Sequence, residues 1–257
     1  MNYLKVNREA WDKRTKIHVG SEFYDVAGFL DGKSSLREIE LGEMPDVDGK
    51  TLLHLQCHFG LDTLSWARKG AIATGLDLSP EAIKQANQLK DKANLEATFI
   101  CADIYEFGEQ VIDTYDVVFT SYGAINWLPS IERWAGVVSK CLKPGGIFYM
   151  AEFHSIYELM SGYPYFYVNE GIVEEGNSYT DRKNSETMTM VTWTHPMSSV
   201  INALIDVGIQ IKKLNEFPFS PYDCFDGLEE REKGRFYLAD SKHDIPLVYS
   251  IMGNKDV

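Results

Sequence analysis

Residues 51–80 read TLLHLQCHFGLDTLSWARKGAIATGLDLSP, and this stretch decides the fold. Two short apolar runs, 51–56 and 72–78, are each followed by a stretch with helical periodicity, 61–69 and 80–93. Apolar runs of this length indicate buried strands. The alternation of strands and helices predicts an α/β fold, with right-handed crossovers and helices on both faces of a parallel sheet.

The same alternation continues on both sides of this stretch. Serine, proline and glutamate at Ser79, Pro80 and Glu81 are typical of a helix start, and Lys143-Pro144-Gly145-Gly146 is typical of a helix end. Further strands are predicted over 97–102, 115–121 and 147–153, with a helix over 131–142. A late helix over 196–207 precedes strands over 209–217 and 245–252, which we expect to form an antiparallel pair at the sheet edge.

Two segments fall outside this pattern. Residues 1–48 precede the first strand, and we expect them to form a helical cap across the site. Residues 155–190 are rich in Tyr, Gly, Asn and Glu without a helical period, which indicates an inserted loop or a small antiparallel lid. The predicted organisation is therefore a cap (1–48) and one domain (49–257) that carries an insertion (155–195).

Composition limits the possible partners. The chain of 257 residues has a formal net charge of −13, so we expect binding to neither nucleic acid nor anionic membranes. No apolar run approaches a membrane span, and the N-terminus lacks the apolar run of a signal peptide, so we expect a cytoplasmic protein. The four cysteines form no CxxC pair, and Cys57, Cys101 and Cys141 lie in or beside apolar runs, which predicts reduced, buried thiols.

The turn after the first predicted strand, Leu55-Gln56-Cys57-His58-Phe59-Gly60-Leu61-Asp62, is the first candidate binding element. A ligand can approach backbone closely only where side chains are small or turn away. A dinucleotide-binding turn would read GxGxxG, but Cys57 and His58 stand where that pattern has a glycine and its neighbour, and only Gly60 is kept. The turn therefore argues against a pyrophosphate site. The alternative to a binding element is an ordinary strand-to-helix turn without a ligand.

Carboxylates follow the next two strands. Asp77 lies at the end of the second strand, where it could accept hydrogen bonds from both ribose hydroxyls of a nucleoside. Asp103 follows the third strand and could accept the adenine amino group, with Ala102 and Ile104 flanking the ring. The alternatives are a helix-capping or solvated carboxylate for Asp77 and a surface carboxylate for Asp103. Tyr122 and Trp127 could face a cationic group or simply pack in the core.

Together these elements resemble the class I S-adenosylmethionine-dependent methyltransferases, most clearly over residues 49–154. Residues 53–60 are similar to the first glycine-rich motif of that superfamily in a degenerate form, and Asp77 and Asp103 match its ribose and adenine acids. Residues 115–118 resemble its fourth strand, and 142–146 a common signature before its fifth. The resemblance implies a Rossmann-like, doubly wound sheet of seven strands, mostly parallel with an antiparallel last strand.

The resemblance implies S-adenosylmethionine as cofactor and direct in-line methyl transfer to an unidentified small molecule. The expected cofactor-binding residues are Leu55, Gln56, Cys57, His58, Gly60, Asp62, Asp77, Leu78, Ala102, Asp103, Ile104, Ser121 and Tyr122. Two alternatives stay open: a non-catalytic relative that only binds the nucleoside, and an NAD-dependent oxidoreductase, which lacks its pyrophosphate loop here.

Candidates on the acceptor side are fewer. His154 follows the fifth strand and could take a proton from the acceptor, or be an ordinary loop histidine. His195, just before a predicted helix, is the second catalytic candidate. It resembles a recurring His-Pro segment of small-molecule methyltransferases, where it looks structural. Residues that could line an acceptor pocket or pack in the lid are His18, Tyr24, Tyr163, Tyr165, Tyr167 and Trp193. No metal site is expected, because His54 and His58 lie on a strand and a turn rather than on one helix face.

Overall fold

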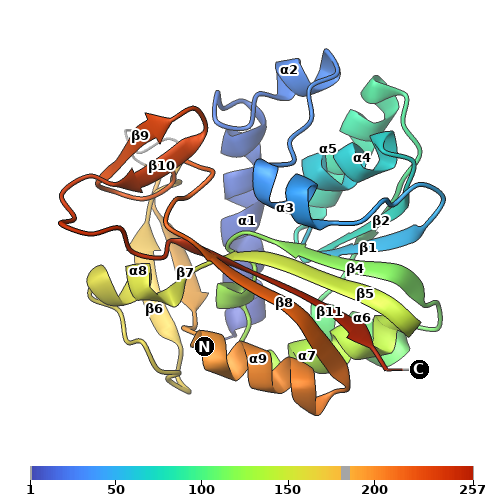
Figure 1. The fold of residues 1–257 in the computed structure, drawn as a ribbon. Helices are drawn as coiled ribbons and strands as arrows, with labels where there is room; N and C mark the ends of the chain where they lie inside the picture. Colours follow the sequence, from blue (N-terminus) through green and yellow to red (C-terminus); the bar gives the residue numbers. More distant parts are fainter. Residues whose placement is uncertain (1, 181–185, 257) are drawn as a thin grey trace.

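A seven-stranded sheet forms the centre of the molecule (Figure 1), seen in a computed structural model that describes residues 2–180 and 186–256. Its strand order is β3-β2-β1-β4-β5-β11-β8. The strands are β1 (Thr51–Leu55), β2 (Ile72–Asp77), β3 (Thr98–Cys101), β4 (Tyr115–Ser121), β5 (Leu142–Phe153), β8 (Ile209–Phe217) and β11 (Val248–Lys255). The first five pair in parallel, whereas β11 runs antiparallel to both β5 and β8. The predicted mostly parallel sheet with an antiparallel last strand is confirmed.

Helices cover both faces of this sheet, as the alternation predicted. One face carries α4 (Leu61–Arg68) and α5 (Pro80–Ala93), and the other carries α6 (Ile104–Gln110), α7 (Ile131–Cys141) and α9 (Met197–Asp206) (Figure 1). Because both faces are covered, successive residues of a strand can all be apolar. In β1, Leu52 packs in the core on one side, while Leu53 and Leu55 pack in the core on the other.

The N-terminal segment is helical. It forms α1 (Tyr3–Val19), α2 (Val26–Leu30) and α3 (Glu38–Glu43). Helix α1 lies between the sheet and the lobe on the left of Figure 1. The Asn7 side chain fixes it there, because it donates to the Val191 carbonyl (2.8 Å) and accepts from the Val191 amide (2.9 Å). The division into a cap and a separate methyltransferase domain stays a prediction.

The lid predicted for the insertion is present as an antiparallel hairpin of β6 (Ile172–Gly176) and β7 (Met188–Thr192). The structure adds elements that the sequence reading missed: helix α6, helix α8 (Ser155–Met160), the 3₁₀ turn η1 (Ile125–Trp127), and a second hairpin of β9 (Leu228–Glu232) and β10 (Arg235–Leu238). Hairpins β6–β7 and β9–β10 lie on the same side of the molecule, beyond α1 (Figure 1).

Three details differ from the sequence prediction. Strand β5 begins at Leu142, five residues before its predicted start at 147, so it includes the segment predicted to end the preceding helix. The last strand begins three residues later than predicted, at Val248, and continues to Lys255. Cys57 and Cys141 are buried free thiols as expected, but Cys101 is exposed because it ends the edge strand β3. Within residues 2–180 and 186–256, no helix combines the length and apolar character that crossing a membrane requires.

Candidate active site

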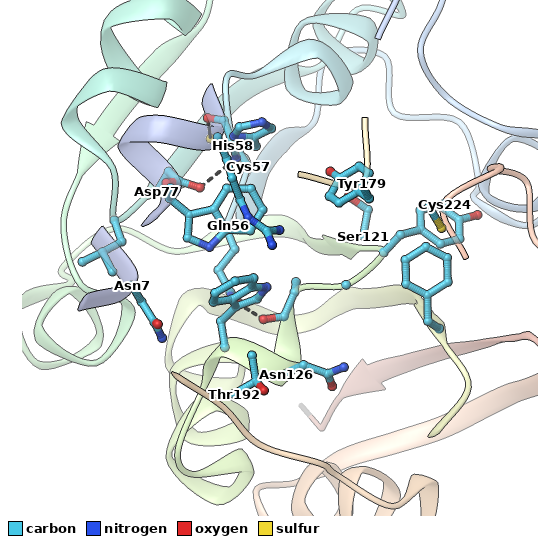
Figure 2. A pocket seen from close by; sticks show the side chains of 18 of the residues that line it. Asn7, Gln56, Cys57, His58, Asp77, Ser121, Asn126, Tyr179, Thr192 and Cys224 are labelled. Carbon is cyan, nitrogen blue, oxygen red and sulfur yellow. Dashed lines mark hydrogen bonds between the residues drawn. The ribbon is translucent and has the colours of Figure 1, made fainter. Parts of the chain in front are cut away.

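A cavity of about 640 Å³ opens where the carboxyl ends of β1, β2, β3 and β4 meet α1 and the lid. This volume lies within the roughly 300–1,000 Å³ typical of small-molecule sites. Every residue expected to hold the cofactor lines it, except Leu55, whose fully buried side chain packs in the core. Figure 2 shows Asp77, His58 and Asn7 on one side of the cavity, with Tyr179 and Cys224 on the opposite side.

The turn after β1 keeps a left-handed backbone at residues other than glycine. Gln56, His58 and Gly60 have φ values of 56°, 52° and 81°. Residues other than glycine seldom adopt such φ values, and local backbone strain of this kind is often found at binding sites. Gly60 is required for a second reason, because a Cβ atom there would lie 2.6 Å from the Phe99 ring. The sequence reading took this turn as degenerate, whereas the backbone bend survives the loss of two glycines.

Asp77 is oriented by main-chain hydrogen bonds. Its Oδ2 accepts from the His58 amide at 2.8 Å (Figure 2), and its Oδ1 accepts from the Ser79 amide, also at 2.8 Å. Each carboxylate oxygen can accept a further hydrogen bond. Burial raises the pKa of Asp77 to about 6, and the nearby charge of Asp12 adds to this shift. The carboxylate therefore lies at the carboxyl end of β2, next to the switch point between β1 and β4, with both oxygens held in place.

Asp103 has a structural task that the sequence reading did not assign. It is the N-cap of the unpredicted helix α6, and its Oδ1 accepts from the amides of Tyr105 and Glu106, both at 3.0 Å. The side chain is 6 % exposed and lines the cavity between Ala102 and Ile104. The alternative of a surface carboxylate is therefore wrong.

Opposite charges lie at the start of α4. Asp62 accepts hydrogen bonds from the hydroxyls of Ser35 and Ser121. Burial raises its pKa, while the Ser35 hydrogen bond, the Arg37 charge and Ser121 lower it. Burial alone would lower the pKa of Arg37, but Tyr222, Asp62 and Glu40 raise it above its usual value. Asp62 and Arg37 both line the cavity, and each charge shifts the pKa of the other group.

Glu152, near the end of β5, shapes the loop after β4. Its carboxylate accepts hydrogen bonds from the amides of Gly123, Ala124, Ile125 and Phe153. Burial raises its pKa, and these four amides lower it. The sequence reading missed this residue, although an acid inside the apolar run IFYMAEF was a usable signal.

His58 links the turn to α1. Its Nε2 lies 2.9 Å from Nδ1 of His18, whose own Nε2 lies 2.8 Å from the Ser178 hydroxyl. Burial lowers the pKa of both imidazoles, so both are neutral at physiological pH. His58 Nδ1 is buried and has no hydrogen-bond partner among the residues that the structure describes, and the ring lines the cavity.

The two histidines proposed as bases lie outside the cavity wall. His154 accepts from the Ile156 amide through Nδ1 and contacts Glu216 through Nε2 at 3.0 Å. His195 donates from Nε2 to the Leu128 carbonyl at 2.8 Å. Both side chains are buried, at 6 % and 4 % exposure, and the geometry favours the structural alternative for each.

The other acceptor-side candidates divide into two groups. Tyr24, Tyr163 and Trp193 line the cavity, as do Tyr122 and Trp127. Three residues are not part of the cavity wall among the described residues: His18, Tyr165 and Tyr167. No group of His, Cys, Asp and Glu within 2–180 and 186–256 has a metal-binding arrangement.

Comparison with known proteins identifies the domain. The profile of the family described as "Methyltransferase domain" matches residues 53–150. Phosphoethanolamine N-methyltransferase 1 of Triticum aestivum is 27% identical over 205 residues, which cover 73% of this chain and 40% of the relative. A ubiquinone biosynthesis O-methyltransferase of Escherichia coli is 25% identical over 150 residues, which cover 56% of this chain and 62% of the relative. The chain thus spans less than two thirds of the length of these relatives.

A solved structure shares the fold. An S-adenosylmethionine-dependent methyltransferase from Mesorhizobium loti superposes with a TM-score of 0.59 at 21% sequence identity, covering 88% of this chain and 100% of that one. The domain match, the relatives and the order of the seven strands agree with one another. The chain is therefore a member of the class I S-adenosylmethionine-dependent methyltransferase superfamily.

Proposed function

We propose that this chain transfers the methyl group of S-adenosylmethionine to a small molecule by direct in-line displacement. One observation carries the proposal: the Asp77 carboxylate, fixed by two main-chain amides, opens onto the cavity beside the left-handed turn 56–60. A carboxylate in this position can accept hydrogen bonds from both hydroxyls of a ribose.

The cavity walls fit the rest of the donor. Ala102, Asp103 and Ile104 would flank the adenine ring beyond Asp77. At the other end, the opposite charges of Asp62 and Arg37 complement the ammonium and carboxylate groups of the methionyl part. Gln56 Oε1 and His58 Nδ1 are buried and unpaired with respect to all described residues, which supports a polar occupant.

When bound, S-adenosylmethionine supplies a methyl group that its sulfonium has already activated. The acceptor's lone pair forms the new bond to the methyl carbon as the carbon–sulfur bond breaks, and S-adenosylhomocysteine is left. The protein's contribution is alignment and exclusion of water. Glu152 holds the 123–125 loop rigid, and the aromatic side chains of Tyr122 and Trp127 line the same cavity, where they can face the cation.

No histidine base is included in this mechanism. His154 and His195 use their ring nitrogens in hydrogen bonds outside the cavity wall. A base is needed only for an acceptor that still carries its proton at neutral pH. The names of the two relatives include an N- and an O-methyltransferase, so they do not select the acceptor atom.

The test is incubation of the protein with methyl-labelled S-adenosylmethionine and a small-molecule cell extract. We expect S-adenosylhomocysteine to accumulate and the label to appear in one low-molecular-weight product. The Asp77→Asn variant is the matched negative control, since it keeps the size of the side chain and loses its charge. Saturable donor binding with no labelled product from any extract would instead support a nucleoside-binding relative without catalysis.

A further inference from the structure

Arg14 is a buried cation in the wall of the cavity. It lies on α1, is 7 % exposed, and is not used in the mechanism above. Its guanidinium carbon lies 5.2 Å from the ring centroid of Trp127, 5.4 Å from that of Trp11 and 5.7 Å from that of Tyr179. Three aromatic rings thus surround the guanidinium and hold it at the cavity wall.

Among the residues that the structure describes, this guanidinium has no compensating anion. It takes part in none of the ion pairs found within 2–180 and 186–256, and one terminal nitrogen contacts the Met190 sulfur. Its Nε is buried without a hydrogen-bond partner. A guanidinium stays charged in proteins, and burying an unpaired charge costs several kcal/mol or more. A ligand that brings an anion would remove this cost.

Arg37 is in a different position. The nearby charges of Asp62 and Glu40 stabilise its charged form, although its Nε, like that of Arg14, is buried without a hydrogen-bond partner among the described residues. Together with Asp62, Arg37 complements the amino-acid end of the donor under the proposed function. The donor carries one carboxylate. If that carboxylate meets Arg37, the anion for Arg14 must come from the second ligand, the methyl acceptor.

We infer that the acceptor is a flat molecule that carries an anionic oxygen group, either a carboxylate or a phosphate, and that Arg14 binds this group. Guanidinium groups bind both anions through paired hydrogen bonds. The aromatic side chains near Arg14, including Tyr24 and Tyr179 with their hydrogen-bonded hydroxyls, provide apolar faces for the body of such a molecule. The inference rests on the proposed function, because it needs the donor to occupy the Asp77 end.

The experiment is calorimetric titration of the protein saturated with S-adenosylhomocysteine. The probes are benzoate, phenyl phosphate and the neutral benzamide. We expect at least one anion to bind about tenfold more tightly than benzamide. Arg14→Gln should remove this preference and change the affinity for S-adenosylhomocysteine less than threefold. Arg8→Gln, an exposed arginine on the same helix, is the matched control and should keep the preference.

Three results would overturn the inference. The first is equal affinity of the wild-type protein for the anions and the amide, or no binding of any probe up to about 20 mM. The second is a preference that survives in Arg14→Gln. The third is a loss of S-adenosylhomocysteine affinity above tenfold in Arg14→Gln, which would assign Arg14 to the donor carboxylate.

Two controls keep the outcome readable. Arg14→Lys keeps the charge, so it tests the anion preference if Arg14→Gln unfolds. The comparison of the two anions with benzamide on the wild-type protein needs no variant. If S-adenosylhomocysteine does not bind at all, the proposed function fails. The comparison of benzoate, phenyl phosphate and benzamide on the ligand-free protein then still tests whether Arg14 binds an oxyanion.

Discussion

The two ends of the cavity are built in different ways. At the donor end, the key groups follow the strands directly and are held by main-chain hydrogen bonds, as Asp77 is by the amides of His58 and Ser79. At the acceptor end, Arg14, Tyr24 and Tyr179 come from α1, the segment after it, and the lid, and they meet through contacts between side chains. The sheet therefore forms the end proposed for the donor, whereas the packing of α1 and the lid against the sheet forms the end proposed for the acceptor.

The largest effect is expected at Glu152, which supports the loop between the two ends. Glu152→Ala leaves four main-chain amides without their acceptor. Since an unsatisfied buried group costs about 1–3 kcal/mol, we expect a loss of at least 3 kcal/mol in the free energy of unfolding. Urea denaturation measures it. Glu96→Ala, at an exposed site, is the control. Equal stability of the two variants would contradict the role of Glu152 in supporting the loop.

Asp77→Asn tests the donor end alone. The amide loses the charge that strengthens hydrogen bonds to the ribose hydroxyls, so we expect affinity for S-adenosylhomocysteine to fall about 30- to 100-fold, or roughly 2–3 kcal/mol. Calorimetry measures the affinity, with Asp91→Asn on the exposed side of α5 as control. Unchanged affinity would contradict the ribose assignment.

The pH dependence of donor binding should follow Asp77. Because burial raises its pKa to about 6, the carboxylate becomes protonated as the pH falls from 7 to 5, and affinity for S-adenosylhomocysteine should drop about tenfold. Asp12 also faces Asp77, and Glu40 and Glu158 titrate near pH 7, so the decisive quantity is the difference between wild type and Asp77→Asn. A profile that is the same in both proteins would assign the titration to another group.

The same pKa shift has the opposite sign for stability. The folded state binds the Asp77 proton more tightly than the unfolded state, whose carboxyl has an ordinary pKa. The stability of the ligand-free protein relative to Asp77→Asn should therefore rise as the pH falls from 7 through 6 toward 4. Thermal unfolding of both proteins across this range checks the sign, and a falling difference would contradict it.

The smallest effect is expected for the acceptor end. Asn7→Ala removes two hydrogen bonds between α1 and β7, which should cost about 1–2 kcal/mol. Hydrogen exchange should accelerate in β6 and β7 while the turn 56–60 stays protected, because that turn is held by Asp77 and the sheet. Asn87→Ala on α5 is the control. Equal acceleration at both ends would show that the two ends are one cooperative unit.

The same contrast explains what the sequence could predict. The bounds of α5 were predicted to the residue, with Ser79 and Pro80 as a local signal for its start. The strands followed from apolar runs, although β5 and β11 begin at other residues than predicted. Helix α6 was missed because Asp103 was interpreted as a ligand-binding acid or a surface carboxylate and not as an N-cap. The positive φ values of Gln56 and His58 could not be predicted, since these residue types do not favour them and the surrounding hydrogen bonds impose them.

The acceptor end was the least predictable part. Arg14 gave no local signal, because its importance depends on Trp127 and Tyr179, which are far from it in the sequence. His154 and His195 gave a local signal, but His154 is hydrogen-bonded to Ile156 and Glu216, and His195 Nε2 to the Leu128 carbonyl. Spacing along the chain reveals strand ends, whereas it does not reveal which side chains a long insertion brings together.

The central claim is that the Asp77 end of the cavity binds the methyl donor, and calorimetric titration with S-adenosylhomocysteine tests it most directly. The account predicts saturable binding at one site per chain, with a dissociation constant below about 1 mM at pH 7.5. A titration without saturable heat at millimolar ligand would contradict it. The His58 imidazole would then block the cavity instead of lining it.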